Sequence, residues 1–138
     1  MSEHIIENIE DIKKFILSGK AIFTIEGNSS RFTYKITKKE TKNNTIYFVS
    51  VLTGCDNLNA YTYLGTIFTN GFRSTQNSTI SKTAPSFIAF NYFYKHLERN
   101  FKHENMNFYH HGRCGRCGKT LTVPESIISG LGPSCVNK

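Results

Sequence analysis

Residues 31–38 read RFTYKITK, and this stretch sets the expected fold of the chain. Its apolar residues alternate with basic or hydroxyl residues, which is the period-two pattern of a β-strand with one buried face. Three further stretches, at residues 21–26, 46–52 and 61–68, are rich in β-branched and aromatic residues. Polar turns separate these stretches, so the sequence predicts an antiparallel sheet of about four strands.

Two helices are expected beside the sheet. Residues 5–17 place isoleucine and phenylalanine at helical spacing and end at a Ser-Gly stop signal. Residues 84–99 open with Ala-Pro-Ser and carry a second aromatic stripe. Residues 72–83 are expected to form an irregular loop and residues 100–107 a polar linker. The predicted fold class is therefore α+β.

The composition is that of a basic protein the size of one domain. The chain has 138 residues and a formal charge of +7, with 17 Lys and Arg against 10 Asp and Glu. A basic surface favours nucleic acid, a ribonucleoprotein or an acidic protein face as partner, whereas the alternative is that the charge serves solubility alone. No apolar run reaches the length of a membrane span, so no membrane partner is expected.

The C-terminal end carries the clearest chemical motif. Residues 110–118 read HHGRCGRCG and residues 132–135 read GPSC, so three of the four cysteines lie here. C-x₂-C spacing lets two thiolates reach one metal ion from a single turn. Gly115 and Gly118 follow the two cysteines and can adopt positive φ, which would let the loop wrap around a metal.

One structural zinc ion is the predicted occupant of this motif. Structural zinc takes four nitrogen or sulfur ligands in a tetrahedron. Cys114, Cys117 and Cys135 supply three ligands, and one of two adjacent histidines supplies the fourth. His110 is preferred, and His111 is nearly as plausible.

The predicted metal site divides the chain into an α+β core domain, residues 1–107, and a zinc-binding module, residues 108–138. The alternatives to zinc are a disulfide pair and inert reduced thiols. No signal peptide is visible at the N-terminus, which indicates a reducing compartment, where clustered cysteines more often bind metal. Cys55 has no C-x₂-C partner and is expected to be a plain thiol.

No catalytic function is expected. A catalytic zinc usually has three protein ligands and an open position, whereas a fourth protein ligand is available here. The glutamate that accompanies the histidines of zinc hydrolases is missing, and no nucleophile elbow, P-loop or paired-carboxylate motif is found. A zinc-dependent hydrolase is the least favoured hypothesis.

Basic and aromatic residues alternate within the first stretch, where Arg31, Lys35 and Lys38 lie between or beside Phe32 and Tyr34. One interpretation is a basic stripe with stacking rings, as in sheet-based modules that bind single strands. The preferred alternative is that the rings face the core and the bases are solvated.

Two other sets are interaction candidates. Arg113, Arg116 and Lys119 flank the first two cysteines, with solvated flanks of the metal site as the alternative. Tyr61 and Tyr63 could form a surface pair, although core-facing rings are again the preferred interpretation.

The tail pattern H-x-G-R-C-G-R-C-G, followed by L-T-V-P-E-S-I and G-x-G-P-x-C, resembles a family of small phage and prophage proteins long labelled as a domain of unknown function. The resemblance covers most of the chain, and the tail is its most specific part. In the pattern of that family, the histidine stands four residues before the first cysteine, which implies His110 as the ligand.

Proteins similar to this one include inhibitors of type II CRISPR effectors. The resemblance therefore implies a phage-encoded anti-CRISPR protein with a structural zinc ion in the host bacterial cytoplasm. Such a protein would bind the nuclease stoichiometrically and obstruct DNA loading or cleavage. The basic charge argues against mimicry of duplex DNA. The runner-up hypothesis is a phage nucleic-acid-binding zinc protein.

Overall fold

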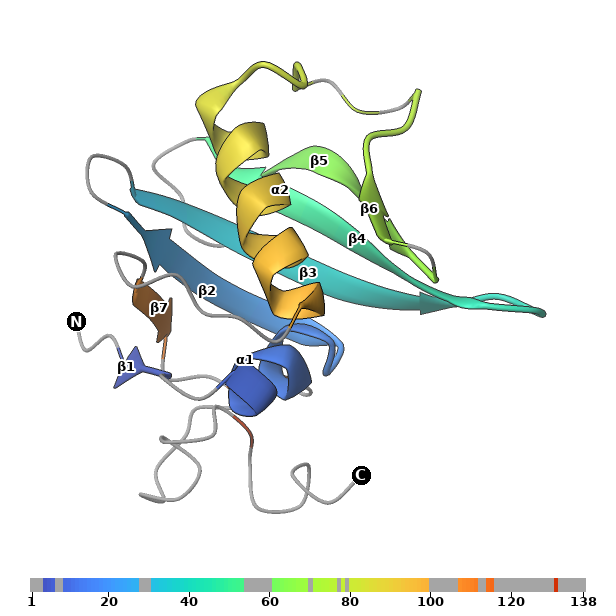
Figure 1. Cartoon of the computed structure of the whole chain (residues 1–138). Coiled ribbons are helices and arrows are strands. Elements are labelled where there is room, and N and C mark those ends of the chain that lie inside the picture. Colours follow the sequence, from blue (N-terminus) through green and yellow to red (C-terminus); the bar gives the residue numbers. More distant parts are fainter. Residues whose placement is uncertain are drawn as a thin grey trace.

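The computed structural model gives an α+β fold. It describes residues 4–6, 9–27, 31–53, 61–69, 71–76, 78, 80–99, 107–111, 114, 115 and 131. Within these residues, one antiparallel sheet of seven strands carries two helices (Figure 1). The predicted fold class is confirmed, but the sheet has more strands than the four that the sequence predicts.

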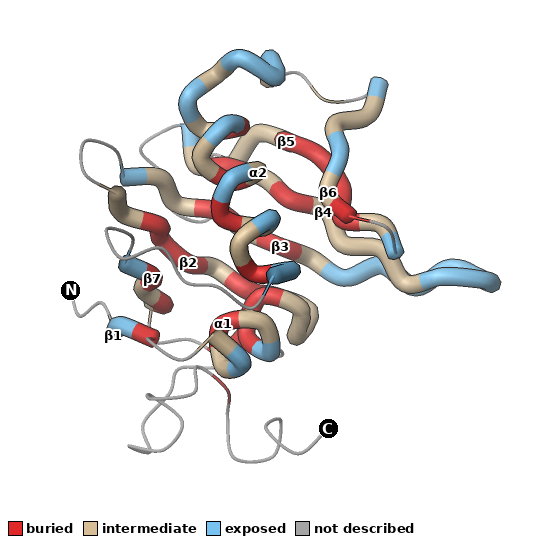
Figure 2. Tube along the Cα trace, in the orientation of Figure 1, coloured by how far each residue is buried: buried red, intermediate tan, exposed pale blue. Residues whose placement is uncertain are grey.

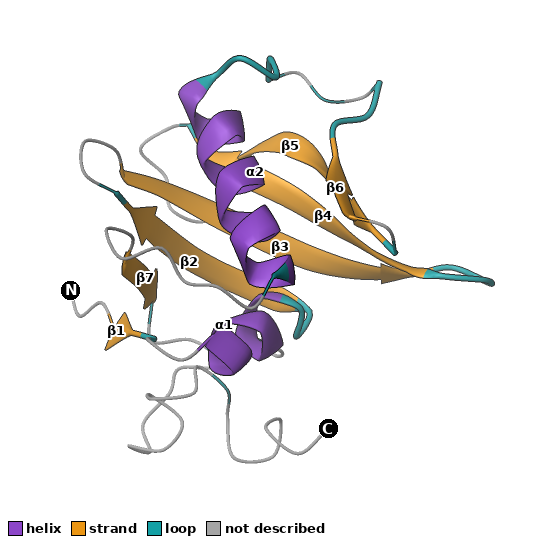
Figure 3. Cartoon of the chain, viewed as in Figure 1, coloured by secondary structure: helices purple, strands orange, loops and turns teal. Residues whose placement is uncertain are grey.

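The four predicted strands form the middle of the sheet, in chain order. They are β2 (Lys20–Glu26), β3 (Arg31–Glu40), β4 (Thr45–Leu52) and β5 (Tyr61–Phe68). Three short strands that were not predicted extend the sheet, namely β1 (His4–Ile5), β6 (Gly71–Arg73) and β7 (Asn107–His110). The order across the sheet is β1-β7-β2-β3-β4-β5-β6, with every neighbouring pair antiparallel (Figure 3).

β7, the last described strand along the chain, lies inside the sheet. It pairs with β2, so that Phe108 lies opposite Ile25 and His110 lies opposite Phe23. The linker predicted at residues 100–107 therefore ends in a strand residue, and the predicted boundary between residues 107 and 108 falls within a strand. Local sequence gives no signal for this pairing, because the two strands are far apart along the chain.

The first helix is shorter than predicted. α1 spans Ile9–Ile16, whereas the sequence predicts a helix over residues 5–17. Ile5 belongs to β1 and pairs with β7, and the backbone N–H of Ile6 donates to the carbonyl oxygen of Phe108 at 3.0 Å. These backbone groups are used by the sheet, so the apolar pattern of residues 5 and 6 serves a strand and not a helix.

The second helix confirms its prediction. α2 spans Pro85–Glu98 and crosses one face of the sheet (Figure 1). The loop predicted at residues 72–83 begins instead with β6, which pairs with β5. Gly65 of β5 makes room for the ring of Phe72, because a Cβ at Gly65 would lie 2.9 Å from that ring.

Aromatic rings fill the core between the sheet and the helices. Phe23 and Phe108 stack with ring centroids 4.9 Å apart, and Phe93 of α2 lies 5.8 Å from Phe108. Tyr34 is fully buried and donates its hydroxyl to the carbonyl oxygen of Ser86 at 2.7 Å. Burial raises the pKa of Tyr34 far above its usual value, so this hydroxyl stays a neutral donor. Figure 2 places the buried positions of β2 to β5 where α2 crosses the sheet.

The other face of the sheet carries no helix among the described residues, and we call it the open face. Successive side chains of a strand point to opposite faces. Since the odd-numbered residues of β2 and β4 face the core, their even-numbered residues lie on the open face, together with the odd-numbered residues of β3. A register shift between Val49 and Ser50 then places Tyr61, Tyr63 and Thr66 of β5 on the open face.

Replacing Phe108 by alanine tests whether β7 is part of the core. We expect the free energy of unfolding to fall by about 3–5 kcal/mol, because the ring packs on three core phenylalanines, Phe15, Phe23 and Phe93. Tyr109→Phe is the matched control on the opposite face of the same strand, and it should cost about 1.5 kcal/mol, the lower end for a hydrogen bond to a charged group, because the Glu26 carboxylate is partly exposed. Urea denaturation measures both values, and equal small losses would show that β7 does not contribute to the core.

Candidate metal centre

The two candidate histidines lie on different faces of the sheet. His110 is opposite Phe23 on the core face, is 0% exposed, and has its ring centroid 5.7 Å from that of Phe15 in α1. His111 reaches the open face, where its Nε2 shares a hydrogen bond with Thr24 Oγ1 at 2.9 Å. One histidine is therefore directed at α1 and the other away from it.

The sheet itself engages His111. Thr24 Oγ1 also lies 2.7 Å from Thr33 Oγ1, so the hydroxyls of β2 and β3 and the imidazole form a short chain of hydrogen bonds. A ring nitrogen that holds such a hydrogen bond is not available to a metal at the same time. His111 could offer a metal only Nδ1.

Cys114 and Gly115 lie at the end of α1, near His110. Cys114 is 1% exposed, and the backbone N–H of Lys20 donates to the carbonyl oxygen of Gly115 at 2.6 Å. A Cβ at Gly115 would lie 2.8 Å from a ring carbon of Phe15, so that ring lies against both Gly115 and His110. The buried imidazole of His110 and Gly115, the neighbour of the buried Cys114, thus lie against one aromatic side chain.

The close packing around Gly115, and not a positive φ, explains why a glycine is needed at this position. The sequence suggests positive φ at this position, but the described glycines with positive φ are Gly19 and Gly71. A side chain at Gly115 would meet Ser18 Oγ at 2.5 Å as well as the ring of Phe15. Sequence reasoning missed this contact, because nothing in the local pattern shows that α1 would pack there.

Several predicted site residues lie outside the described residues, namely Cys117, Cys135, Arg113, Arg116 and Lys119, and so does Cys55. Leu131, between the second and third cysteines of the motif, is described and buried. No group of three or more His, Cys, Asp or Glu side chains gathers within the described part of the chain. The nitrogen and sulfur donors that are described there, His110 and Cys114, suit zinc in their chemistry.

The basic residues predicted on β3 do not share one face. Arg31 and Lys35 lie on the open face. Lys38 lies on the same side of the strand as Tyr34 and Ile36, beyond its buried part. The single basic stripe is therefore corrected. The preferred interpretation of the neighbouring rings is confirmed, since Tyr34 is in the core and Phe32 packs against it.

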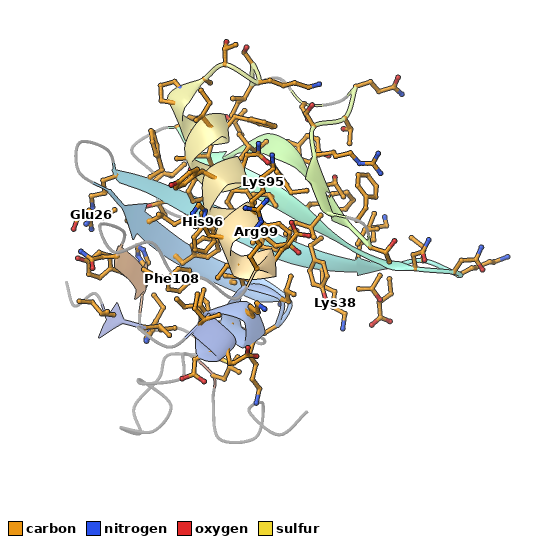
Figure 4. All side chains as sticks on the ribbon, in the orientation of Figure 1. Glu26, Lys38, Lys95, His96, Arg99 and Phe108 are labelled. Atoms are coloured by element: carbon orange, nitrogen blue, oxygen red, sulfur yellow. The ribbon has the colours of Figure 1, made fainter. Side chains whose placement is uncertain are left out.

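Arg31 is held at one end of the sheet by an acid and a ring. Its guanidinium lies 3.0 Å from a Glu26 carboxylate oxygen and 5.4 Å from the centre of the Tyr109 ring. Tyr109 donates its hydroxyl to the same carboxylate at 3.0 Å, and this hydrogen bond, with Arg31, lowers the pKa of Glu26. Figure 4 shows Glu26 and Lys38 at opposite ends of the β2–β3 pair, where Lys38 lies 3.3 Å from Glu40.

Comparison with known proteins gives a family for the C-terminal segment alone. Residues 105–138 match a family described as "Family of unknown function (DUF6011)". This segment contains β7 and the whole cysteine motif. No curated protein and no solved structure matches the chain. Neither described helix is long and apolar enough to cross a membrane.

Gly115→Ala tests the docking of the cysteine motif on α1. The added methyl group would overlap Ser18 Oγ and the buried ring of Phe15, so we expect a loss of about 1–3 kcal/mol in the free energy of unfolding. Limited proteolysis should also cut faster after residue 111. Adding Ser18→Ala to this variant should recover part of the loss, because it removes the closest contact. A fully stable Gly115→Ala variant would contradict this packing.

Proposed function

We propose that His110, Cys114, Cys117 and Cys135 hold one structural zinc ion. The support is the burial of His110 and Cys114, the packing of His110 and Gly115 against Phe15 on the core face, and the C-x₂-C spacing of the motif. Such an ion would fix the chain after β7 against α1 and the start of β2. Its contribution would be to folding, since metal affinity in small modules adds directly to stability.

Two histidine variants separate the proposed ligand from its neighbour. His110→Ala should lower the zinc content of the dialysed protein well below one ion per chain, as measured by inductively coupled plasma mass spectrometry. His111→Ala should retain about one ion per chain, because His111 reaches the open face, whereas His110 lies on the core face beside Phe15. The reverse pattern would make His111 the ligand, and no zinc in the unaltered protein would exclude the metal site.

We further propose that the chain is a non-catalytic protein that binds nucleic acid. The observation that carries this proposal is the uneven charge of the open face. Among the described strand residues, this face holds one acid, Glu26, which is paired with Arg31. The bases there are Lys20, Arg31, Lys35, Lys39 and Arg73. A face with five bases and one acid attracts phosphates.

The inhibitor hypothesis is a more specific proposal that rests on the resemblance of the tail. A type II effector carries a guide RNA and a DNA strand, so a protein that binds nucleic acid could act on it. The basic open face supports contact with RNA, DNA or an acidic protein surface. We therefore place nucleic-acid binding first and effector inhibition second.

Titration with a labelled oligonucleotide at several salt concentrations tests the proposed function. Binding through phosphates should weaken steeply with salt, with a slope of log K against log salt of about −0.7 for each phosphate contact on a single strand. A pull-down of a type II effector with and without guide RNA, beside a DNA-cleavage assay, tests the second proposal. No binding of any oligonucleotide at low salt, together with stoichiometric inhibition of the effector, would reverse the order of the two proposals.

A further inference from the structure

We infer that the open face between β3 and β6 binds single-stranded nucleic acid, with bases stacking on Phe48, Tyr61 and Tyr63. This inference rests on the proposed nucleic-acid binding and names the surface and the kind of strand. Sheet surfaces bind single strands when exposed rings receive the bases and nearby cations receive the phosphates. The three rings and two of the bases of the open face lie in this arrangement.

Strand register places rings and bases in two adjoining rows across the sheet. In one row, Lys35 of β3 pairs with Ser50 of β4, which pairs with Tyr63 of β5. In the other row, Phe48 of β4 pairs with Thr66 of β5, which pairs with Arg73 of β6. Neighbouring strands are about 4.8 Å apart, so one short stretch of nucleic acid could cover both rows.

The rings are held in place and are still partly accessible. Phe48 and Tyr63 meet edge to face, with centroids 6.1 Å apart. The Tyr63 hydroxyl is hydrogen-bonded to Thr66 and lies 3.1 Å from Thr75 Oγ1, which fixes the orientation of the ring. Phe48, Tyr61 and Tyr63 are all half-buried. A ring that is already fixed loses little entropy when a base stacks on it.

A cation lies over a ring at each side of this surface. Lys35 Nζ is 5.6 Å from the centre of the Tyr61 ring, and the Arg73 guanidinium is 5.1 Å from the centre of the Phe68 ring. Lys35 lies over the ring face on which a base would stack, so a stacked base would displace its ammonium group, which could then reach a phosphate of the strand, and Arg73 supplies a second cation at the edge of the surface. The acid of the open face, Glu26, is at the far end of β2 beside Arg31.

The hydroxyl of Tyr61 adds an independent observation. Within the described residues, it is a buried polar atom with no hydrogen-bond partner. Such groups are rare in folded proteins, and burial raises the pKa of Tyr61, so the hydroxyl stays a neutral donor. An acceptor atom of a bound nucleotide would satisfy this donor.

The main rival surface lies on the outer side of α2. Ile88 and Tyr92 are 55% and 46% exposed there, with Lys95 and Arg99 nearby along the helix (Figure 4). This surface has one exposed ring, and its bases are accompanied by Glu98. The open face has the three proposed stacking rings, with Phe68 beside them, and no acid between β3 and β6 among the described residues, so it fits a single strand better.

Fluorescence anisotropy with a labelled 20-nucleotide oligo-dT and a duplex of matched length tests the inference. We expect the unaltered protein to bind the single strand more tightly than the duplex. Tyr61→Leu and Tyr63→Leu should each weaken single-strand binding about 5- to 100-fold, while Tyr61→Phe and Tyr63→Phe should retain most of it. Tyr92→Leu on α2 is the matched control and should bind as the unaltered protein does.

The outcomes separate the inference from the proposed function. If Lys35→Gln weakens binding but removal of the rings does not, and the duplex binds equally well, the protein binds phosphates and the stacking surface is refuted. If nothing binds at low salt, both proposals fail. If the ring variants impair only capture of a protein effector, the open face is a protein interface and the inference is wrong. Thermal unfolding of each variant checks that the fold is retained.

Discussion

The structure depends on the pairing of β7 with β2. This pairing places Phe108 on Phe23 and closes the aromatic core below α1 and α2. It also gives β1 its neighbour, because β1 pairs only with β7 within the described sheet. Moreover, it fixes His110 on the core face at the end of α1, and Cys114 and Gly115 follow from there. The backbone hydrogen bonds between β2 and β7 therefore both complete the sheet and position His110 in the candidate metal centre.

The sequence predicts the elements whose signal is local. The alternation of residues 31–38 and the aromatic stripe of residues 84–99 are patterns within a single strand and a single helix. Both predictions agree with the structure. β1, β6 and β7 are two to four residues long, which is too short for a period to be read. They form because a longer neighbouring strand has backbone N–H and C=O groups that still need hydrogen-bond partners. These groups can be identified only in the folded sheet.

The candidate site was predicted unevenly for the same reason. The C-x₂-C spacing and the two histidines are local features, so the ligand types could be named from the sequence. The choice between His110 and His111 depends on the face of the sheet on which each side chain lies. These faces follow from the pairing register of β7 with β2. The rings of Tyr61 and Tyr63 are a similar case. The preferred interpretation from the sequence, rings that face the core, is wrong, because the register shift between Val49 and Ser50 assigns both rings to the open face.

The β2–β7 contact also has a consequence for how the chain is made. Thr24 and His111, which share a hydrogen bond, are separated by 87 residues. Contacts between such distant residues form late, because the entropy of closing a long loop must be overcome first. On a ribosome, β2 to β5 can pair with one another as they emerge, but the edge of β2 stays uncovered until β7 has also emerged. An exposed strand edge is a site of mispairing between nascent chains. β7 thus acts as an intramolecular cap on an aggregation-prone intermediate.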